Sequence, residues 1–273
     1  MNGVITICLN KEIYYHWTEV LFKSILLHTN VDFALVYDNV EWFNKYNLNT
    51  LVKYPIYKTD IENPYTFKYE LINHSPFDNT IFFDADTIIF KDITPLFNEQ
   101  FLSVCAEWEN DWIYNEFSFI QNPDKITKDF GLQKLYSAYS GFIRFEKTEF
   151  YLNLFQTILN NIHFDRRIAK LYNMIMPDEY FLDISISDLD LNKFIPIKLY
   201  YSNSVDNINE YYGFTFQNCT DIKIEHLDSF ILDTLKKIEI SNYMLSIVKS
   251  KINKEINIID NQLVISSIKK MII

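Results

Sequence analysis

The first third of the chain alternates short apolar runs with longer stretches in which apolar residues recur every three or four positions. Four of the runs predict strands, at residues 3–9, 32–39, 54–60 and 80–84. The longer pattern predicts one helix over residues 11–28 and another over 65–74, the second followed by the turn sequence SPFDN. Because strands that alternate with helices usually pair in parallel, the pattern predicts an α/β fold with a mostly parallel central sheet flanked by helices.

The rest of the chain continues this alternation less regularly. Strands are predicted at four places, at residues 101–108, 140–147, 194–202 and 220–228. A helix is predicted over 148–164, and a further element begins after Pro177. Residues 231–273 contain no glycine or proline and are predicted to form a tail of amphipathic helices with lysines on the solvated face; contact of this tail with a membrane surface is the alternative. With no repeat or linker in it, the segment 1–230 is predicted to be one domain.

Composition and charge exclude several classes of protein. A chain of 273 residues with 48% hydrophobic residues can bury a substantial core, and no apolar stretch approaches the roughly 18 residues of a membrane span. The first residues lack the pattern of a secretion signal, so we expect a cytoplasmic protein. Because the net charge is -11, nucleic acid is not expected as a partner. The four glycines cannot form a glycine-rich phosphate loop, and the three cysteines match neither a disulfide framework nor a zinc site.

Two aspartates, Asp84 and Asp86, stand between the apolar runs TIFF and TIIF. If the strand continued through them, both carboxylates would point to the same side, about 6.6 Å apart. Their repulsion would then be about 2.5 kcal/mol at an effective dielectric near 20. A divalent cation offsets such repulsion, and carboxylate oxygens favour Mg²⁺ or Mn²⁺, which keep positions open for phosphate oxygens. The alternative is that the aspartates only cap a turn and the helix that follows.

The segment FFDADTIIFKDITPLF (residues 82–97) resembles the D-x-D region of nucleotide-sugar glycosyltransferases of the GT-A fold. It is most similar to the family of glycogenin and the bacterial lipopolysaccharide glucosyl- and galactosyltransferases. Other segments follow in the same order as in that family: LNKEIYY after the first strand, Lys68 sixteen positions before Asp84, Ser140-Gly141-Phe142, and Asp178-Glu179 in place of a D-Q pair. The resemblance covers residues 3–230 and implies a GT-A (Rossmann-like) domain, with a nucleotide-sugar-binding half over about 1–100 and an acceptor half over about 101–230.

The activity that this resemblance implies is metal-dependent transfer of a hexose from a nucleoside diphosphate sugar, with UDP as the expected nucleotide, to a glycan or another hydroxyl-bearing acceptor. Asp84 would contact the metal and the donor ribose, Asp86 would bind the metal, and His226 would be the third ligand. The cofactor would be Mn²⁺ or Mg²⁺, which neutralises the charge that develops on the departing nucleoside diphosphate.

Five further residues would bind the substrate if the resemblance holds. Lys68 would place a positive charge near the donor diphosphate. Tyr14 or Tyr15, which are equal candidates by spacing, would stack on the donor base. Ser140 and Gly141 correspond to the family's segment of a small residue and a glycine before an apolar strand.

The chain departs from the family pattern in two places. His226 is followed by LDSFILDTLKK instead of a glycine and K-P-W, so Lys236 or Lys237 replaces the missing lysine or the donor is held differently. The acidic Glu179, beside Asp178, is either at the reacting carbon of a retaining enzyme or the general base of an inverting one. The D-A-D-T segment favours retention. Both acids also suit the first turn of a helix, where the helix dipole favours negative charge.

Three other functions compete with that of a glycosyltransferase. A haloacid-dehalogenase-like magnesium phosphatase also has a D-x-D after an apolar strand, but Ile88 stands where that pattern needs threonine or valine, and no glycine is followed by aspartate. A sugar-phosphate nucleotidyltransferase would need a glycine-rich signature near its start. A catalytically inactive protein of the same fold would keep the binding site and lose metal dependence.

Overall fold

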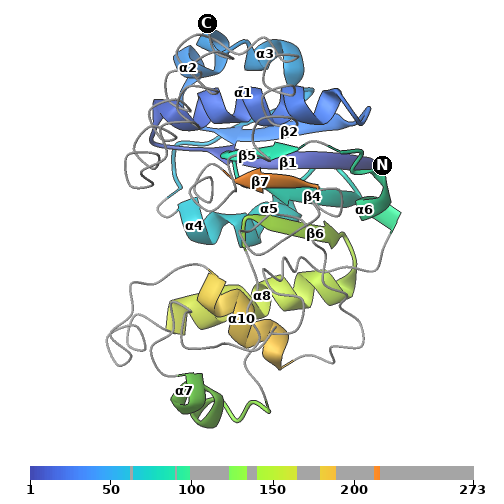
Figure 1. The fold of residues 1–273 in the computed structure, drawn as a ribbon. Coiled ribbons are helices and arrows are strands. Elements are labelled where there is room, and N and C mark those ends of the chain that lie inside the picture. The colour runs from blue at the N-terminus through green and yellow to red at the C-terminus, as the bar shows by residue number, and fades with distance from the viewer. Residues whose placement is uncertain are drawn as a thin grey trace, which may run out of the picture.

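The structure, a computed structural model, describes residues 1–61, 64–89, 91–98, 123–133, 140–164, 179–188 and 212–215. Its centre is a five-stranded sheet with helices on both faces (Figure 1). The strands lie in the order β3-β2-β1-β4-β6. They are β1 (Asn2–Cys8), β2 (Asp32–Tyr37), β3 (Tyr54–Tyr57), β4 (Asn79–Phe83) and β6 (Phe142–Glu146).

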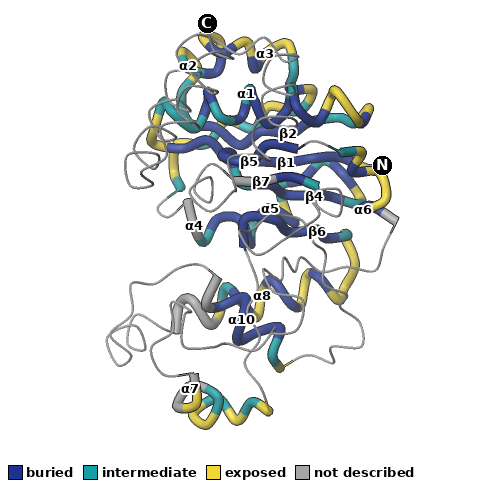
Figure 2. Tube along the Cα trace, viewed as in Figure 1, coloured by how far each residue is buried: buried dark blue, intermediate teal, exposed yellow. Residues whose placement is uncertain are grey.

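Four of the five strands are parallel, and β6 runs antiparallel to β4 at one edge. The inner strands are dark along most of their length in Figure 2, because helices cover them on both sides. The apolar runs that form β1, β2 and β4 are therefore interior strands of a mostly parallel sheet, whereas β3 lies at its edge and is only partly buried. This arrangement confirms the predicted class of fold.

Each face of the sheet has its own apolar core. The helices on one face are α1 (Glu12–Leu26), α2 (Val40–Lys45) and α3 (Leu48–Leu51), whose buried side chains pack with Val4, Leu35 and Phe83. On the other face, one core joins Ile5 and Phe82 to a second group of helical segments. These are α4 (Pro64–Phe67), the 3-10 turn η1 (Lys68–Glu70), α5 (Leu71–His74), α8 (Glu149–Phe164) and α10 (Glu179–Ser187).

A second, two-stranded sheet follows the carboxyl end of β4. It pairs β5 (Thr87–Ile89) with β7 (Gly213–Thr215) in antiparallel register, Thr87 opposite Thr215. Close approach explains the glycine of β7, because a Cβ at Gly213 would overlap the carbonyl oxygen of Ile88. In the described part of the chain, the remaining helices are α6 (Thr94–Asn98) and α7 (Pro123–Asp129).

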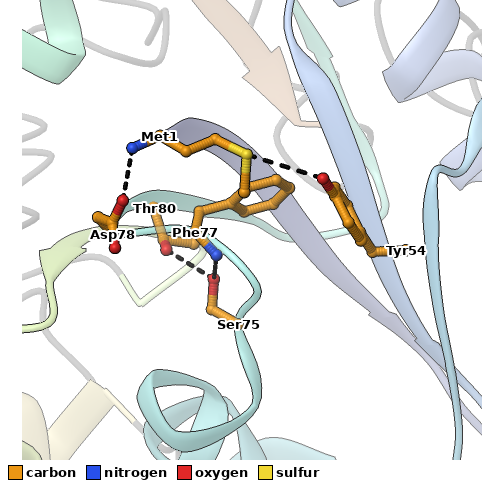
Figure 3. Close-up of polar contacts among 6 residues, drawn as sticks. All are labelled: Met1, Tyr54, Ser75, Phe77, Asp78 and Thr80. Atoms are coloured by element: carbon orange, nitrogen blue, oxygen red, sulfur yellow. Dashed lines mark hydrogen bonds and ion pairs between the residues drawn. The ribbon is translucent and has the colours of Figure 1, made fainter.

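The amino end of the central sheet is closed by packing (Figure 3). The ring of Phe77 lies against β1, so closely that a Cβ at Gly3 would overlap it. Beside it the hydroxyls of Ser75 and Thr80 are hydrogen-bonded at 2.7 Å, and the Met1 ammonium donates to Asp78 at 2.6 Å. At this end of the sheet, the Phe77 ring therefore fills the space beside Gly3.

The predicted elements differ from the observed ones in detail. The strand predicted over 54–60 ends at Tyr57, and the helix predicted over 65–74 is divided by the 3-10 turn. Helices α2 and α3 were not predicted, because each is too short to show a period; a capping signal for α2 is present, since the Asn39 side chain accepts a hydrogen bond from Trp42 N at 2.9 Å.

Several predictions lie outside the described residues, namely the strands at 101–108, 194–202 and 220–228 and the helical tail at 231–273. The division of the chain into domains stays a prediction for the same reason. Among the helices that the structure describes, none is both long and apolar enough to cross a membrane.

Candidate functional site

The candidate site lies where β1 and β4 separate. The chain builds β1, β2 and β3 on one side and then returns to place β4 on the other side of β1, so the strand order reverses between β1 and β4. Towards their carboxyl ends, β1 stays paired with β2 as far as Cys8 and Tyr37 but with β4 only as far as Ile5 and Phe82. In open α/β sheets, ligands bind in the crevice at such a reversal.

The two aspartates lie in a turn at this point and not in a continuing strand. Strand β4 ends at Phe83 and β5 starts at Thr87, and Thr87 N donates to the Asp84 carbonyl at 3.2 Å. A strand that continues through both aspartates is therefore not what forms, because the backbone turns between the two residues. The Asp84 side chain is 34% exposed, whereas Asp86 is 7% exposed.

Four of the residues proposed from the sequence meet at this turn. The Lys68 ammonium lies 3.5 Å from Asp84 Oδ1 and donates to Ser140 Oγ at 3.1 Å and to the Ser140 carbonyl at 3.2 Å. The Gly141 carbonyl accepts a hydrogen bond from Asp84 N at 2.8 Å. Lys68 is only 4% exposed and also lies over the ring of Phe82, at 5.3 Å. Three elements distant in sequence, η1, β4 and the start of β6, thus place one cation beside one carboxylate.

The two candidate tyrosines have different environments. Tyr15 is 0% exposed, and its hydroxyl donates to Asp38 Oδ1 at 2.8 Å while accepting from Asp38 N and Asn39 N. Burial, followed by the hydrogen bond to Asp38, raises the pKa of Tyr15. Tyr14 is half-buried, with its ring centroid 5.6 Å from that of Trp17. Of the two rings, Tyr15 therefore joins α1 to the end of β2 and has no exposed face for a base.

Asp38 is a structural residue of this edge that the sequence did not single out. Its second carboxylate oxygen accepts a hydrogen bond from Asn10 N at 2.7 Å. Asn10 has a φ of 66°, in the left-handed region that asparagine tolerates better than most residues. The aspartate thereby fixes the loop between β1 and α1, and its position directly after an apolar strand was the available signal.

His16, which follows Tyr15 on α1, is buried. It is 5% exposed, with its ring centroid 3.6 Å from that of Tyr46. Burial lowers the pKa of His16 to about 4, and the nearby Glu12 carboxylate opposes this shift only in part. Glu12 in turn accepts hydrogen bonds from Lys45 and Tyr46. This group links α1 to the end of α2, with His16 and Tyr46 buried and the Glu12–Lys45 pair at the surface.

The remaining site candidates are only partly described. Asp178 and His226 lie outside the described residues, and Glu179 is the first residue of α10. Within the ranges that the structure covers, no three His, Cys, Asp or Glu side chains come together as a metal site. Strand β7 brings Thr215 opposite Thr87, the residue directly after Asp86, and so leads the later part of the chain to the turn.

The chain is similar to several solved glycosyltransferase structures. GlyE of Streptococcus pneumoniae TIGR4 matches with a TM-score of 0.47 and 14% identity, over 70% of this chain and 46% of GlyE. An active-site mutant of LgtC matches with a TM-score of 0.47 and 13% identity, over 68% and 70% of the two chains. Mouse xyloside xylosyltransferase 1 has a TM-score of 0.47 and 11% identity, over 72% and 85%. The match thus spans less than half of the GlyE structure.

No protein-family model and no curated protein matches the sequence.

Proposed function

We propose that this protein is a metal-dependent glycosyltransferase, which moves a hexose from a nucleoside diphosphate sugar, with UDP as the expected nucleotide, to a hydroxyl acceptor. The observation that carries the proposal is the meeting of Lys68, Asp84 and Ser140 at the carboxyl end of β4. This is the point of strand reversal where an α/β sheet binds its ligand. The resemblance to the glycosyltransferase family assigns all three residues to one donor site, which agrees with their proximity.

The carboxylates of Asp84 and Asp86 suit Mn²⁺ or Mg²⁺, because hard oxygen ligands on one short turn leave several positions open for phosphate oxygens. When bound, the cation neutralises negative charge on the departing nucleoside diphosphate. His226 is the proposed third ligand. It lies 11 positions after Thr215, and an extended chain covers about 3.3 Å per residue, which is ample to bring it to the turn.

Lys68 supplies a second positive charge to the same diphosphate. A lysine that is 4% exposed has its ammonium fixed by neighbouring groups, here Asp84 and Ser140, so its charge is oriented before the donor arrives. Preorganised charge of this kind stabilises a transition state with little reorganisation. Ser140 and Gly141 are proposed to line the donor site from the start of β6.

Tyr14 is the proposed platform for the donor base, since Tyr15 is enclosed in the core. Asp178 and Glu179 are proposed to act at the reacting carbon, and the reaction is proposed to retain the configuration of the sugar. If Glu179 acts as a general base on the acceptor hydroxyl instead, the configuration is inverted. The anomeric proton signal of the product distinguishes these two outcomes.

The test is release of nucleoside diphosphate from a panel of nucleotide sugars in the presence of Mn²⁺. We expect one donor to be used by the wild type and not by Asp86→Ala. The matched control is Asp78→Ala, which removes an exposed carboxylate at the opposite end of the sheet and should leave the rate unchanged. Manganese-dependent nucleotide binding without release would instead identify the protein as an inactive member of this fold. Absence of both binding and release would refute the proposal.

A further inference from the structure

Where β1 and β4 separate, a buried backbone carbonyl has no partner in the ladder between these two strands. The last register pair between these strands is Ile5 with Phe82, so the Phe83 carbonyl lies beyond the ladder although the residue is fully buried. A buried carbonyl that loses its donor is costly. A side chain supplies the donor here, because Thr6 Oγ1 donates to the Phe83 carbonyl at 2.5 Å.

The same peptide unit is held from its other side by β6. Its N–H group belongs to Asp84 and donates to the Gly141 carbonyl at 2.8 Å. The carbonyl of Phe83 and the N–H of Asp84 are thus bonded to two different parts of the sheet, β1 through a side chain and the start of β6 through the backbone. With both polar groups engaged, this peptide plane cannot rotate freely, and it is the plane from which Asp84 projects.

The threonine at position 6 is suited to donating this hydrogen bond to the Phe83 carbonyl. Thr6 is 0% exposed and stands in the apolar strand sequence GVITICL, where valine would fill the same volume without a polar atom. Burying a hydroxyl in such surroundings is unfavourable unless it makes a hydrogen bond. A β-branched side chain also has few rotamers, so its hydroxyl is directed at one acceptor.

We propose that Thr6 is a positioning residue for the metal-binding turn, which holds Asp84 in the orientation that the cation and Lys68 require. The inference rests on the proposed function. It predicts that removal of the Thr6 hydroxyl weakens metal binding more than loss of a comparable buried hydrogen bond elsewhere. Partners that orient a metal ligand typically change metal affinity by about tenfold or more when they are removed.

The experiment measures Mn²⁺ binding to the full chain in the presence of UDP, by the loss of the electron paramagnetic resonance signal of free Mn²⁺. The variants are Thr6→Val, which removes the hydroxyl at constant volume, and Thr6→Ser, which keeps it. The control is Thr80→Val, because Thr80 is also fully buried in β4 and its hydroxyl is bonded to Ser75 at the distant end of the strand (Figure 3). The melting temperature of every variant is measured alongside.

We expect Thr6→Val to bind Mn²⁺ about tenfold more weakly, Thr6→Ser to bind nearly as well as the wild type, and Thr80→Val to be less stable with unchanged Mn²⁺ affinity. Equal Mn²⁺ affinity in Thr6→Val and Thr80→Val would overturn the inference. If Thr6→Val does not fold, Thr6→Ser is compared with Thr6→Cys, which exchanges the oxygen for a weakly donating sulfur, and equal affinities would again overturn it. Failure of the wild type itself to bind Mn²⁺ with UDP would count against the proposed function.

Discussion

Lys68→Met separates two effects of the ammonium beside Asp84. One is its positive charge near the donor diphosphate, and the other is its competition with a cation for the Asp84 carboxylate. The ammonium lies 3.5 Å from Asp84 Oδ1, which corresponds to an attraction of about 5 kcal/mol at an effective dielectric near 20. Most of this attraction is offset by the cost of burying the ammonium and by the solvent around the partly exposed carboxylate. The net stabilisation by the ion pair is about 1 kcal/mol. In the absence of nucleotide, Lys68 therefore competes with a cation for Asp84.

The expected effects of Lys68→Met on metal binding and on turnover have opposite signs. Without nucleotide, Mn²⁺ affinity should rise about fivefold, since about 1.4 kcal/mol corresponds to a factor of ten. Release of nucleoside diphosphate from the donor should fall by about a hundredfold or more, because a fixed positive charge near the leaving group is lost. Electron paramagnetic resonance of free Mn²⁺ gives the first quantity, and a coupled assay of nucleoside diphosphate gives the second.

The matched control for this substitution is Lys53→Met. Lys53 also pairs with an aspartate, Asp32 at 2.6 Å, but it is on the surface at the amino end of the sheet. Neither Mn²⁺ affinity nor turnover should change in this variant. If Lys68→Met weakens Mn²⁺ binding and turnover together, Lys68 supports the turn structurally and does not compete with the cation, and the proposed competition is refuted.

Three further predictions concern stability, each measured by urea denaturation. Tyr15→Phe should destabilise the fold by about 1–3 kcal/mol, because the backbone N–H and the carboxylate of Asp38 both lose a partner; an unchanged midpoint would contradict this role. Gly3→Ala should cost about 1–3 kcal/mol, since its Cβ would overlap the Phe77 ring, and a cost below about 0.5 kcal/mol would mean that the ring moves aside. His16 has its pKa lowered from 6.5 to about 4, so the unfolded chain binds more protons in that range and stability should fall as pH falls from 6.5 to 4. His16→Gln should remove that part of the pH dependence, and an unaltered slope would exclude His16 as its source.

The sequence predicted the sheet well because its inner strands, β1, β2 and β4, are apolar runs buried on both faces. It left a turn at Asp84 as the alternative to a continuing strand, because apolar runs stand on both sides of D-A-D and neither glycine nor proline marks a break. The turn forms because β4 leaves β1 after Phe82 and β5 pairs with β7, a segment more than a hundred residues later. Tertiary pairing of this kind leaves no local signal.

The candidate residues were chosen from residue type and order, neither of which shows burial. Spacing within the resemblance singled out Lys68 and Ser140, but their hydrogen bond joins residues 72 positions apart. Periodicity placed Tyr14 and Tyr15 on one helix without showing which ring is enclosed. Asp38 and Thr6 were missed because aspartate after a strand and threonine within one are both common.

The two ends of the central sheet differ in what packs against or bonds to the backbone there. At the amino end, the ring of Phe77 packs against Gly3 and closes the sheet. At the carboxyl end, where strands separate, side chains bond to backbone groups in place of the ladder: Thr6 to the Phe83 carbonyl, Asp38 to Asn10 N, and Lys68 to the Ser140 carbonyl. These three side chains therefore stabilise the backbone at the edge where the proposed chemistry takes place. Because the bonds are made within the protein, we expect the orientation of Asp84 to be set before any cation or donor binds, which is the property that a preorganised site requires.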